Sequence, residues 1–598
     1  MKPRIQRRPL PDVPIQWPAS LHPVLCRIYA ARGIESVDQV EHRLGCLQPP
    51  GALAGMDRAC ELLERAIDEQ RHIVVVGDFD ADGATGTAVA VRGLRALGAK
   101  NVGYAVPNRF RHGYGLSPAV VAELPAHATQ LLITVDNGIS AHAGVAAAKA
   151  RGMQVIVTDH HLPGDALPNA DAIVNPLLAR SSPARDSISG GAPPDMLAHL
   201  AGVGVMFYLL LALRARFRQR GRYANAAASE PDLSALLDLV ALGTVADLVA
   251  LDRNNRILVD AGLKRIRSGR MCAGIAALID CGKRDPSRLI ASDLGFTVAP
   301  RLNAAGRLDD MGLGIECLLT DDASRARELA QMLSGINAQR RELQTDMVEQ
   351  AEAEVRKWQA RGTTELPFGV VLFNPDWHHG VVGLVASKLK ETLHRPVIAC
   401  AAADGDCTVD PDHSTDRGLV KASGRSIPGF HLRDALADVD ARHPGLIVRF
   451  GGHAMAAGLS LHRADIDRFA AAFDVVAHER LGAQSLRATV LTDGELEAAD
   501  FCLDLACQLR DAGPWGQGFP EPLFDGEFDL ASWKIMGEVH LRLILRHADL
   551  GQPLEAVMFN AYEGTPPPSR VRVAFQLDVN TWNDKQRLQL LIRHLESV

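Results

Sequence analysis

The sequence predicts a multidomain α/β protein in which a doubly wound parallel sheet is followed by a smaller α/β domain and a C-terminal β-barrel. Short apolar runs alternate with helical runs between about residues 70 and 180, and polar and apolar residues alternate in short runs near the C-terminus. The length of 598 residues exceeds what one hydrophobic core supports, and at about 150 residues per domain it allows roughly three to four domains.

The first domain is expected to be doubly wound because helical runs separate its strand candidates. Three of the four candidates are continuously apolar, which is typical of parallel strands that are covered on both faces. Ser117-Pro118 and Ser140 are favourable helix starts, and Gly152 is a favourable helix end. The expected strands are 72–77, 102–106, 131–135 and 153–158, and the expected helices are 85–97, 118–124 and 141–151.

The rest of the chain changes character several times. Apolar residues at helical spacing over 329–358 predict one long connecting helix or a broken pair. A second α/β region follows, and its polar, acidic stretch 401–418 is expected to be a flexible insertion. Period-two patterning, as in 539–545, then predicts the barrel. The expected divisions of the chain are 1–55, 56–320, 321–362, 363–482 and 483–598.

Composition and charge restrict the class of protein. The hydrophobic content of 47% and the charged content of 23% are ordinary for a soluble globular protein. The net charge is -7 and the sequence pI is about 6.3, whereas nucleic-acid-binding domains are typically basic. Any nucleic-acid site would therefore be a local basic patch on an acidic protein.

Cysteine usage and hydropathy indicate a compartment. The ten cysteines form no CxxC pair, so they offer neither a zinc site nor a disulfide framework, and they suit a reducing cytosol. The N-terminus lacks the apolar run of a signal peptide. The most apolar segment, 200–213, is shorter than the ~20 residues that a membrane span needs, so a buried helix is expected there. We expect a cytoplasmic protein.

Acidic and imidazole side chains gather where three of the expected strands end. The carboxyl ends of parallel strands meet at one edge of a sheet, so these groups should converge. Converging carboxylates repel one another unless cations bind between them. Mixed carboxylate and imidazole ligands suit Mg²⁺ or Mn²⁺, and the imidazole favours Mn²⁺. The residues are Asp78, Asp80 and Asp82 after the first strand, Asp136 after the third, and Asp159, His160 and His161 after the fourth.

Asp247 is a further candidate ligand because it is a lone carboxylate inside the apolar run 241–249. A helix cap would look the same in the sequence, so both alternatives stay open for this residue. Two cations about 4 Å apart would activate a water molecule and stabilise the leaving oxygen of a phosphoryl transfer. A dinucleotide-binding dehydrogenase is excluded, because the first turn is acidic where a G-x-G-x-x-G loop would be required.

The acidic segments resemble the four motifs of the DHH phosphoesterases, and the run Asp159-His160-His161 is the triplet for which that superfamily is named. Within the superfamily the chain resembles the bacterial RecJ family over nearly its whole length, in the domain order DHH, connecting helix, DHHA1 and OB-fold. The runs that carry this resemblance are VPNRFRHGYGLS (106–117), TVDNGIS (134–140), PRLNAAGR (300–307), KASGRSIPG (421–429), GGHAMAAG (451–458) and GPWGQGFPEPLF (513–524).

The resemblance implies ligands for two cations, Mn²⁺ or Mg²⁺. Small-molecule members of the superfamily carry a histidine where this chain has Val76, so the second ion would bind less tightly or depend on Asp78 as an extra ligand or nearby base. By carry-over, Asp82, Asp136, His160 and Asp247 would hold one ion, and Asp80 with the shared Asp136 would hold the other.

The resemblance also implies roles for the other two residues of the DHH triplet. His161 would face the scissile phosphate and stabilise its developing charge. Asp159 would orient the two histidines through hydrogen bonds.

Contacts to single-stranded DNA follow from the same resemblance. Arg109, Ser423 and Arg425 would hold the 5′-terminal phosphate, since guanidinium forks suit bidentate phosphate binding. Arg301 would contact another phosphate.

Other candidate contacts keep two alternatives each. Tyr114 would stack on a base or be packed in its turn, and His453 would contact phosphate or be a structural histidine. Asn303 would contact DNA or brace the connecting helix. The candidates on the OB-fold, for which core packing is the alternative, are Trp533, Arg542, Arg546 and Trp582.

The implied function is that of a single-stranded-DNA-specific 5′→3′ exonuclease in DNA recombination and repair. It would release nucleoside 5′-monophosphates by two-metal hydrolysis as a monomer, with a RecQ-type helicase and a single-strand-binding protein as partners. One alternative is a DHH/DHHA1 phosphoesterase for short oligoribonucleotides or cyclic dinucleotides, but such chains are shorter and lack the OB region. The other is a non-enzymatic DNA-binding relative, but such relatives lose the metal ligands that are intact in this chain.

Overall fold

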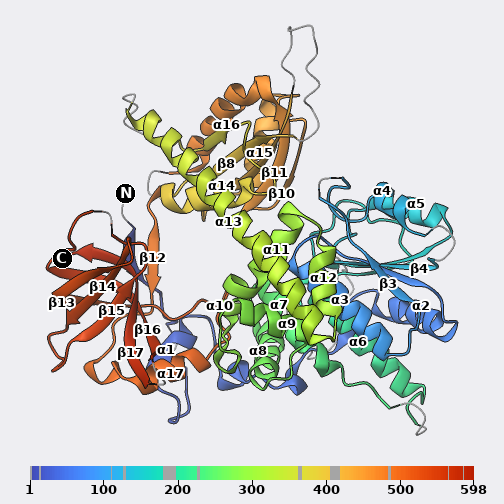
Figure 1. The fold of residues 1–598 in the computed structure, drawn as a ribbon, viewed down its shortest axis with the longest axis horizontal. Helices are drawn as coiled ribbons and strands as arrows, with labels where there is room; N and C mark the ends of the chain where they lie inside the picture. Colours follow the sequence, from blue (N-terminus) through green and yellow to red (C-terminus); the bar gives the residue numbers. More distant parts are fainter. Residues whose placement is uncertain are drawn as a thin grey trace. The chain divides into compact units, whose positions relative to one another are not determined.

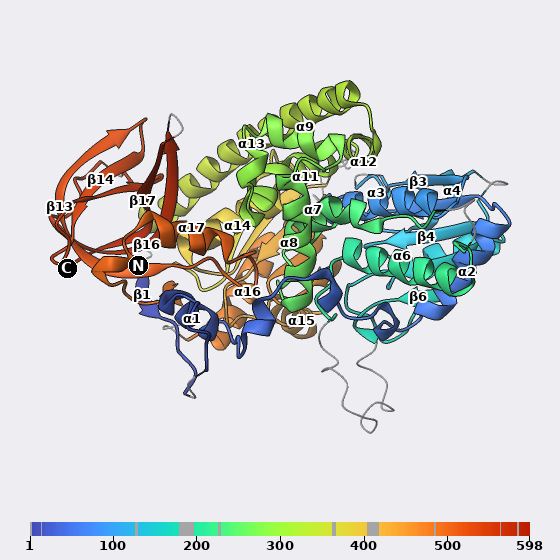
Figure 2. The same cartoon turned by 90° about the horizontal axis from the view of Figure 1, so that it is seen from below.

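A computed structural model of the chain describes residues 3–12, 15–109, 111–125, 129–178, 197–224, 229–360, 366–403, 418–482, 486–562, 564–582 and 585–598. These residues fall into two compact units. The larger unit comprises Ile5–Gly335 and Leu491–Val598, and the smaller unit comprises Met1–Arg4 and Ile336–Val490. Figures 1 and 2 show the elements of each unit in two views at right angles.

A five-stranded parallel sheet is the centre of the larger unit. Its strands are β2 (Ile73–Val76), β3 (Val102–Ala105), β4 (Leu131–Val135), β5 (Gln154–Thr158) and β6 (Ala172–Val174). They lie in the order β3-β2-β4-β5-β6, and every neighbouring pair is parallel. The four strands expected from the sequence are confirmed, whereas β6 spans three residues and was not predicted, because so short a run carries no periodicity.

Helices cover both faces of this sheet. They are α2 (Met56–Asp68), α3 (Ala81–Ala96), α4 (Pro118–Glu123), α5 (His142–Ala150) and α6 (Gly202–Gln219). Ile73 and Val75 pack in the core that contains α2, α3 and α6, whereas Val74 and Val76 pack in the core that contains α4 and α5. Successive residues of a strand point to opposite faces, so this split confirms the doubly wound arrangement.

The chain after the sheet is helical, as expected. The apolar segment 200–213 is largely buried, and most of it belongs to α6. Among the described residues, no helix combines the length and the apolar character that a membrane span requires. The remaining elements are α7 (Leu237–Ala246), α8 (Arg253–Arg267), α9 (Ala273–Cys281), α10 (Ala291–Asp293), the π-helical turn η8 (Leu294–Val298), α11 (Ala299–Leu308) and α12 (Gly312–Leu319). The predicted connecting helix is confirmed as one continuous element, α13 (Ala323–Ala360).

The C-terminal β-domain of the larger unit is a closed barrel with the strand order β13-β14-β15-β17-β16. Leu541, Leu543 and Leu545 are buried and alternate with less buried residues, as the period-two pattern predicted. This confirms a small OB-type barrel. The strands are β13 (Phe524–Met536), β14 (His540–Arg546), β15 (Leu554–Met558), β16 (Arg570–Trp582) and β17 (Lys585–Ser597), and α17 (Leu503–Asp511) precedes them.

The N-terminal segment ties the barrel to the rest of the larger unit. Arg32, which follows α1 (Pro23–Ala30), donates hydrogen bonds of 2.8 and 3.0 Å to the carboxylate of Asp493, and both side chains are almost completely buried. Arg32 also donates to the carbonyl of Pro520 at 2.9 Å. Two short strands, β1 (Arg4–Arg7) and β12 (Thr489–Thr492), pair with each other beside this region.

The smaller unit contains a mixed sheet with the order β10-β11-β9-β8-β7. Only β7 and β8 are parallel, and the other neighbouring pairs are antiparallel. Most of the stretch expected to be an insertion lies outside the described residues, between β8 and β9. The elements are β7 (Val370–Phe373), α14 (Val382–Leu393), β8 (Val397–Ala402), β9 (Leu419–Arg425), α15 (Leu432–Arg442), β10 (Arg449–Gly452), β11 (Ala456–His462) and α16 (Ile466–Arg480).

The buried Arg32–Asp493 pair yields a stability prediction. Replacing Arg32 with Ala leaves the Asp493 carboxylate buried without its main partner, which typically costs about 3–5 kcal/mol. We expect a clearly lower thermal unfolding midpoint, measured by circular dichroism. Arg43→Ala removes an exposed partner of Glu41 and should not change the midpoint. Equal midpoints for both variants would contradict the assignment of Arg32 as a buried tie.

Candidate metal centre and nucleic-acid contacts

The acidic residues lie at the switch point of the parallel sheet. β3 lies on one side of β2, and β4, the next strand along the chain, lies on the other side. Ligands of open α/β sheets bind where the strand order reverses in this way, beyond the carboxyl ends of the strands. Asp78 follows β2, Asp136 follows β4 and Asp159 follows β5.

His160 is the centre of one group of ligands. Its Nε2 atom lies 3.1 Å from Oδ1 of Asp136, 3.6 Å from Oδ2 of Asp247 and 3.9 Å from Oδ2 of Asp82. These four residues, from four separate segments of the chain, are the set that the sequence predicted for one cation. One ligand atom each from Asp82, His160 and Asp247 lies within 4.8 Å of the others.

A second group shares Asp136 with the first. Ligand atoms of Asp78, Asp80 and Asp136 all lie within 4.8 Å of one another. Asp136 has a φ of 64°, a left-handed conformation that is uncommon for a residue other than glycine. Such outliers concentrate at functional sites, where the surrounding structure holds them in place.

Backbone donors anchor the acids that begin α3. The carboxylate of Asp80 is the N-cap of α3 and accepts hydrogen bonds of 3.0 Å from the amides of Asp82 and Gly83. The carboxylate of Asp82 accepts hydrogen bonds from the first two amides of α6, at Gly202 (2.6 Å) and Val203 (2.9 Å). Helix N-termini favour negative charge, so the amides of Gly202 and Val203 act against the burial that raises the pKa of Asp82.

Glycines let the backbone approach these acids closely. A Cβ atom at Gly202 would lie 2.5 Å from Cβ of Asp136. One at Gly306 of α11 would lie 1.7 Å from the carbonyl oxygen of Phe79, between Asp78 and Asp80. Neither position has room for a side chain, so both glycines are required by packing.

The structure places Asp247 at the C-terminal end of α7 with its carboxylate beside His160, and its role as a metal ligand stays a prediction. It is the C-cap residue of α7, where its amide donates to the carbonyl of Gly243 at 3.0 Å, and its side chain also faces His160. The next residue, Leu248, has a φ of 63° and an exposed side chain. The chain therefore turns sharply just after the carboxylate.

Asp159 holds both histidines of its triplet. Its Oδ1 atom accepts hydrogen bonds from the amides of His160 (2.7 Å) and His161 (3.1 Å) and lies 2.8 Å from Nδ1 of His161. Its Oδ2 atom accepts from the amide of Ile139 at 2.8 Å. Burial opposes ionisation of Asp159, but these hydrogen bonds and the His161 charge outweigh it and lower the pKa of the carboxyl. Burial in turn lowers the pKa of His161, but Asp159 outweighs it, so the pKa is raised overall.

The carboxylates themselves lack enough positive partners. Burial, followed by repulsion from neighbouring carboxylates, raises the pKa of Asp78, Asp136 and Asp247 well above the ordinary value. Burial and the charge of Asp80 raise the pKa of Asp82 to about 7. Buried Oδ1 atoms of Asp78 and Asp136 accept no hydrogen bond from the described residues. Oxygen and imidazole donors in this state fit divalent cations.

Two residues that the sequence analysis missed support this centre. The ring of Phe79 lies under the Arg109 guanidinium, with Cζ 4.1 Å from the ring centroid, and meets Tyr114 edge to face. Asn137 donates to the carbonyls of Val76 (3.0 Å) and Val135 (2.9 Å) and so joins the ends of β2 and β4. Both lie next to acids in the motifs, and that adjacency was the only signal available.

The other nucleic-acid candidates of the larger unit are placed differently. The Tyr114 hydroxyl donates to the carbonyl of Asp136 at 3.1 Å and approaches Nδ1 of His161 at 3.3 Å, while half of the residue is exposed. Oδ1 of Asn303 accepts from the amide of Ala81 at 2.8 Å and so braces the start of α3. Arg301 donates to the carbonyls of Thr297 and Cys281 and to the hydroxyl of Ser334. Arg109 lies near Asp78 and Asp80, and burial lowers its pKa although both carboxylates raise it.

The smaller unit brings its candidates together at the start of α14. Arg425 donates to the Ser423 hydroxyl at 3.0 Å, and a Cβ atom at Gly383 would lie 2.9 Å from both side chains. A guanidinium, a hydroxyl and a helix N-terminus are each groups that can bind an anion. The His453 amide donates to the carbonyl of Ala456, at the turn between β10 and β11.

On the barrel, Trp533 is partly exposed and stacks with Tyr562 at a centroid distance of 6.0 Å. Arg542 is paired with Glu555 at 2.6 Å, and Arg546 is exposed at the end of β14. The Trp582 side chain lies outside the described part.

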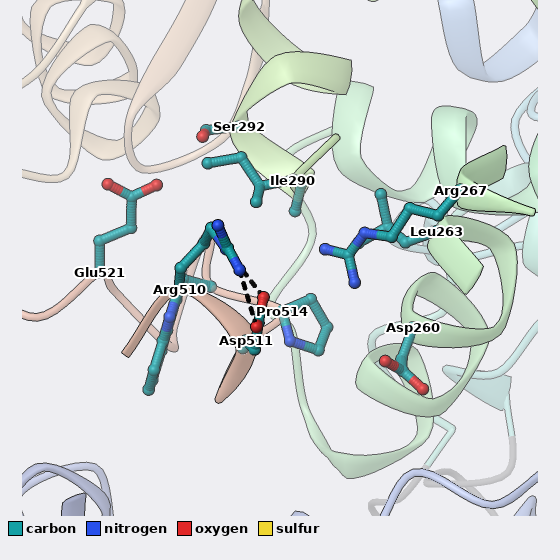
Figure 3. A pocket seen from close by; sticks show the side chains of 12 residues that line it. Asp260, Leu263, Arg267, Ile290, Ser292, Arg510, Asp511, Pro514 and Glu521 are labelled. Carbon is teal, nitrogen blue, oxygen red and sulfur yellow. Dashed lines mark hydrogen bonds and ion pairs between the residues drawn. The ribbon is translucent and has the colours of Figure 1, made fainter. Parts of the chain in front are cut away.

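A pocket in the larger unit contains none of these residues. It lies between α8 and the segment that leads into the barrel. Figure 3 shows Asp260 and Arg267 of α8 facing Arg510, Asp511 and Glu521, and Arg510 pairs with Asp511 at 2.9 Å. Opposite charges lie close together in its lining, so the pocket favours neither anions nor cations.

Comparison with known proteins agrees with this architecture. Residues 72–244 match the DHH family N-terminal domain, 367–479 the DHHA1 domain and 492–594 the RecJ OB domain. The chain is 48% identical over 596 residues to the single-stranded-DNA-specific exonuclease RecJ of Dickeya dadantii (strain 3937), which covers 99% of each chain.

Two crystal structures of RecJ from Thermus thermophilus are similar over 97% of this chain. The complex with Mn²⁺ has a TM-score of 0.76 and 30% identity and is covered to 76% of its length. The complex with Mg²⁺ has a TM-score of 0.71 and 28% identity and is covered to 75%. With this agreement in sequence, domain content and fold, the chain belongs to the RecJ family of DHH proteins.

Proposed function

We propose that the protein is a metal-dependent exonuclease that degrades single-stranded DNA from its 5′ end and releases nucleoside 5′-monophosphates. The observation that carries this proposal is the convergence of Asp82, Asp136, Asp247 and His160 at the switch point of the sheet. Membership of a family whose relatives are named single-stranded-DNA-specific exonucleases supports the substrate.

The proposed ligands divide into two sets. Asp82, Asp136, His160 and Asp247 would hold one cation, and Asp80 with the shared Asp136 would hold the other. Asp78 is a further ligand of the second ion, because it lies in the same group and Val76 offers none. When bound, Mn²⁺ or Mg²⁺ supplies Lewis acidity, which lowers the pKa of a water molecule and offsets charge on the leaving oxygen.

His161 is the proposed contact to the scissile phosphate. Its pKa is raised overall by Asp159, so a larger fraction of the ring carries a proton and a positive charge near neutral pH. A protonated ring can donate to a non-bridging phosphate oxygen and stabilise the charge that develops there. Asp159 acts through His161: it accepts the hydrogen bond from Nδ1 and leaves Nε2 to donate.

Phosphate capture is proposed for two groups of residues, one in each unit. In the smaller unit, Arg425 and Ser423 at the start of α14 would bind the 5′-terminal phosphate. In the larger unit, Arg109 on the Phe79 ring is a further proposed phosphate contact, and Tyr114 would position the substrate beside His161. Binding a terminal phosphate would make the reaction start at an end.

The wider setting is also part of the proposal. We propose a monomer that acts in the cytoplasm in DNA recombination and repair, with a RecQ-type helicase and a single-strand-binding protein as partners and with the OB-type barrel as a second single-strand contact. The boundaries 1–55, 56–320, 321–362, 363–482 and 483–598 are proposed for its segments. A phosphoesterase for cyclic dinucleotides is less well supported, because residues 492–594 match a RecJ OB domain.

Loss of the shared ligand provides the direct test of activity. Asp136→Ala should reduce degradation of 3′-labelled single strands in Mn²⁺ by more than the ~10–100-fold that is typical for loss of an outer partner of a metal ligand. The wild-type protein should give a shortening ladder on single strands and leave a duplex intact. Asp57→Ala, an exposed carboxylate on α2, is the matched control and should behave as wild type. Full-length DNA that remains bound to wild-type protein would refute the nuclease proposal.

The raised pKa of Asp82 predicts a pH dependence. The Asp82 carboxyl has an unperturbed pKa of 3.8, and its pKa is about 7 in the folded protein without metal. Between pH 3.8 and about pH 7 the folded state therefore binds more protons than the unfolded state. Its contribution to stability is therefore fully present below 3.8 and is lost as the pH rises through about 7. Thermal midpoints of metal-free protein should fall with pH in this window more steeply for wild type than for Asp82→Asn. Parallel curves would contradict the assignment.

The phosphate contact proposed for Arg425 predicts that the chemical group at the 5′ end of the substrate affects its KM. Arg425→Ala removes a charge-assisted contact worth ~1.5–3 kcal/mol and should raise the KM for 5′-phosphorylated single strands by roughly 10–100-fold. The KM for 5′-hydroxyl strands should change much less. Arg442→Ala removes an exposed arginine of the same unit, paired with Glu479, and serves as the control. An equal loss on both substrates would show that Arg425 does not read the terminal phosphate.

A further inference from the structure

The run 513–524 was singled out by the sequence, but the site described above gives it no role. Its centre is a tight turn, in which the amide of Gly516 donates to the carbonyl of Phe519 at 2.8 Å and the amide of Phe519 donates back at 3.1 Å. Gly518 has a φ of 72°, as the third residue of a type II turn requires. We call residues 516–519 the anchor turn.

Aromatic and cationic side chains from α1, from α8 and from the run itself pack around the anchor turn. Trp515 and Phe519 stack at 5.0 Å, and Tyr29 stacks on Trp515 at 6.1 Å. The Arg256 guanidinium lies over the Phe519 ring with Cζ 4.3 Å from the centroid, and it donates to the carbonyl of Leu251 at 2.9 Å. These contacts fix the position of the anchor turn, and Arg256 connects it to the carbonyl of Leu251.

The anchor turn also packs against residues 250 and 251, which follow Asp247 in the chain. The amide of Leu251 donates to the carbonyl of Gln517 at 2.7 Å. A Cβ atom at Gly518 would lie 3.2 Å from Cβ of Ala250, and one at Gly516 would lie 2.7 Å from Cδ1 of Leu251. These close approaches leave residues 250 and 251 little freedom to move towards the anchor turn.

That segment completes the strained turn at Leu248. A left-handed leucine persists only where its surroundings hold it. The amide of Leu248 donates to the carbonyl of Val245 at 3.4 Å on the α7 side, and residues 250 and 251 are held on the other side. Asn255 donates to the carbonyl of Ala250 at 2.9 Å and to the carbonyl of His199 at 2.7 Å. His199 is three residues before Gly202, whose amide donates to the Asp82 carboxylate. Asp247 is therefore fixed by α7 on one side and by this clamped segment on the other.

We propose that the anchor turn positions Asp247 and thereby sets the affinity of the cation site built from Asp82, Asp136, His160 and Asp247. This inference rests on the proposed metal centre. Its positioning residues are Gly516, Gln517 (through its carbonyl) and Gly518, none of which contacts the cation site directly. The second set, Asp78, Asp80 and Asp136, has no contact with residues 516–519 among the described interactions and keeps its affinity.

The test measures metal binding by the full-length protein without DNA. Metal-stripped wild type, Gly518→Ala and Gly537→Ala are titrated with Mn²⁺, and free Mn²⁺ is followed by its six-line electron paramagnetic resonance signal. Gly537 is the matched control, because it also has a positive φ (59°) and lies in the barrel, but a Cβ atom there would meet only His540. Thermal midpoints of the metal-free variants show whether backbone strain acts equally in both.

We expect wild type and Gly537→Ala to bind two Mn²⁺ ions, and Gly518→Ala to bind one of them on the order of 10-fold more weakly, the range typical for partners of metal ligands. The KM for single strands should stay unchanged, and excess Mn²⁺ should restore kcat. Wild-type affinity for both ions in folded Gly518→Ala would overturn the inference and leave the proposed function intact. Absence of Mn²⁺ binding by wild type would instead refute the metal centre.

A second, milder variant keeps the test decisive in case Gly518→Ala misfolds. If Gly518→Ala does not fold, Gly516→Ala is titrated in its place, because the atom in its way is the end of the Leu251 side chain and can move aside. Weakened binding of one ion supports the inference, and unchanged binding of both overturns it.

Discussion

Repulsion among buried carboxylates is the constraint on which the rest of the structure depends. Asp78, Asp82 and Asp136 are nearly inaccessible to solvent, and Asp247 faces the same small volume. The fold supplies backbone donors from α3 and α6 to two of the five acids around this volume and leaves oxygens of Asp78 and Asp136 without a hydrogen bond from the described residues. Burial, followed by repulsion from the negative charge that remains, raises the pKa values of these carboxyls, and this charge fits the binding of divalent cations.

The neighbours of the ligands hold this arrangement in place. Asn137 joins the ends of β2 and β4, Asn303 braces the start of α3, and Asp159 fixes the histidines. Each makes at least one hydrogen bond to a backbone group in the segments that carry the candidate ligands, and Asp159 also bonds the ring Nδ1 of His161. The ligands thus depend on residues that would never touch a cation, and we infer that this dependence extends to the anchor turn.

The sequence predicted what depends on residue type and local period. Asp136 and His160 were identified because charged groups follow apolar strands, and α13 because its apolar spacing is regular. Phe79 and the anchor turn were missed as parts of the site, because neutral residues carry no chemical signal until their neighbours in space are known. The antiparallel pairing of β9 with β11 depends on contacts between distant residues, which no local pattern records. The end of α7 places the carboxylate of Asp247 beside His160, and this contact depends on the fold and could not be predicted from the local pattern.

The repelling carboxylates are proposed to hold two cations that share Asp136. The most direct measurement is an anomalous difference map at the manganese absorption edge, from crystals of the full-length protein grown with Mn²⁺. We expect two peaks on either side of the Asp136 carboxylate, one beside His160 and Asp247 and the other beside Asp78 and Asp80. A map without peaks in this volume, or with Mn²⁺ only at other residues, would contradict the proposed centre.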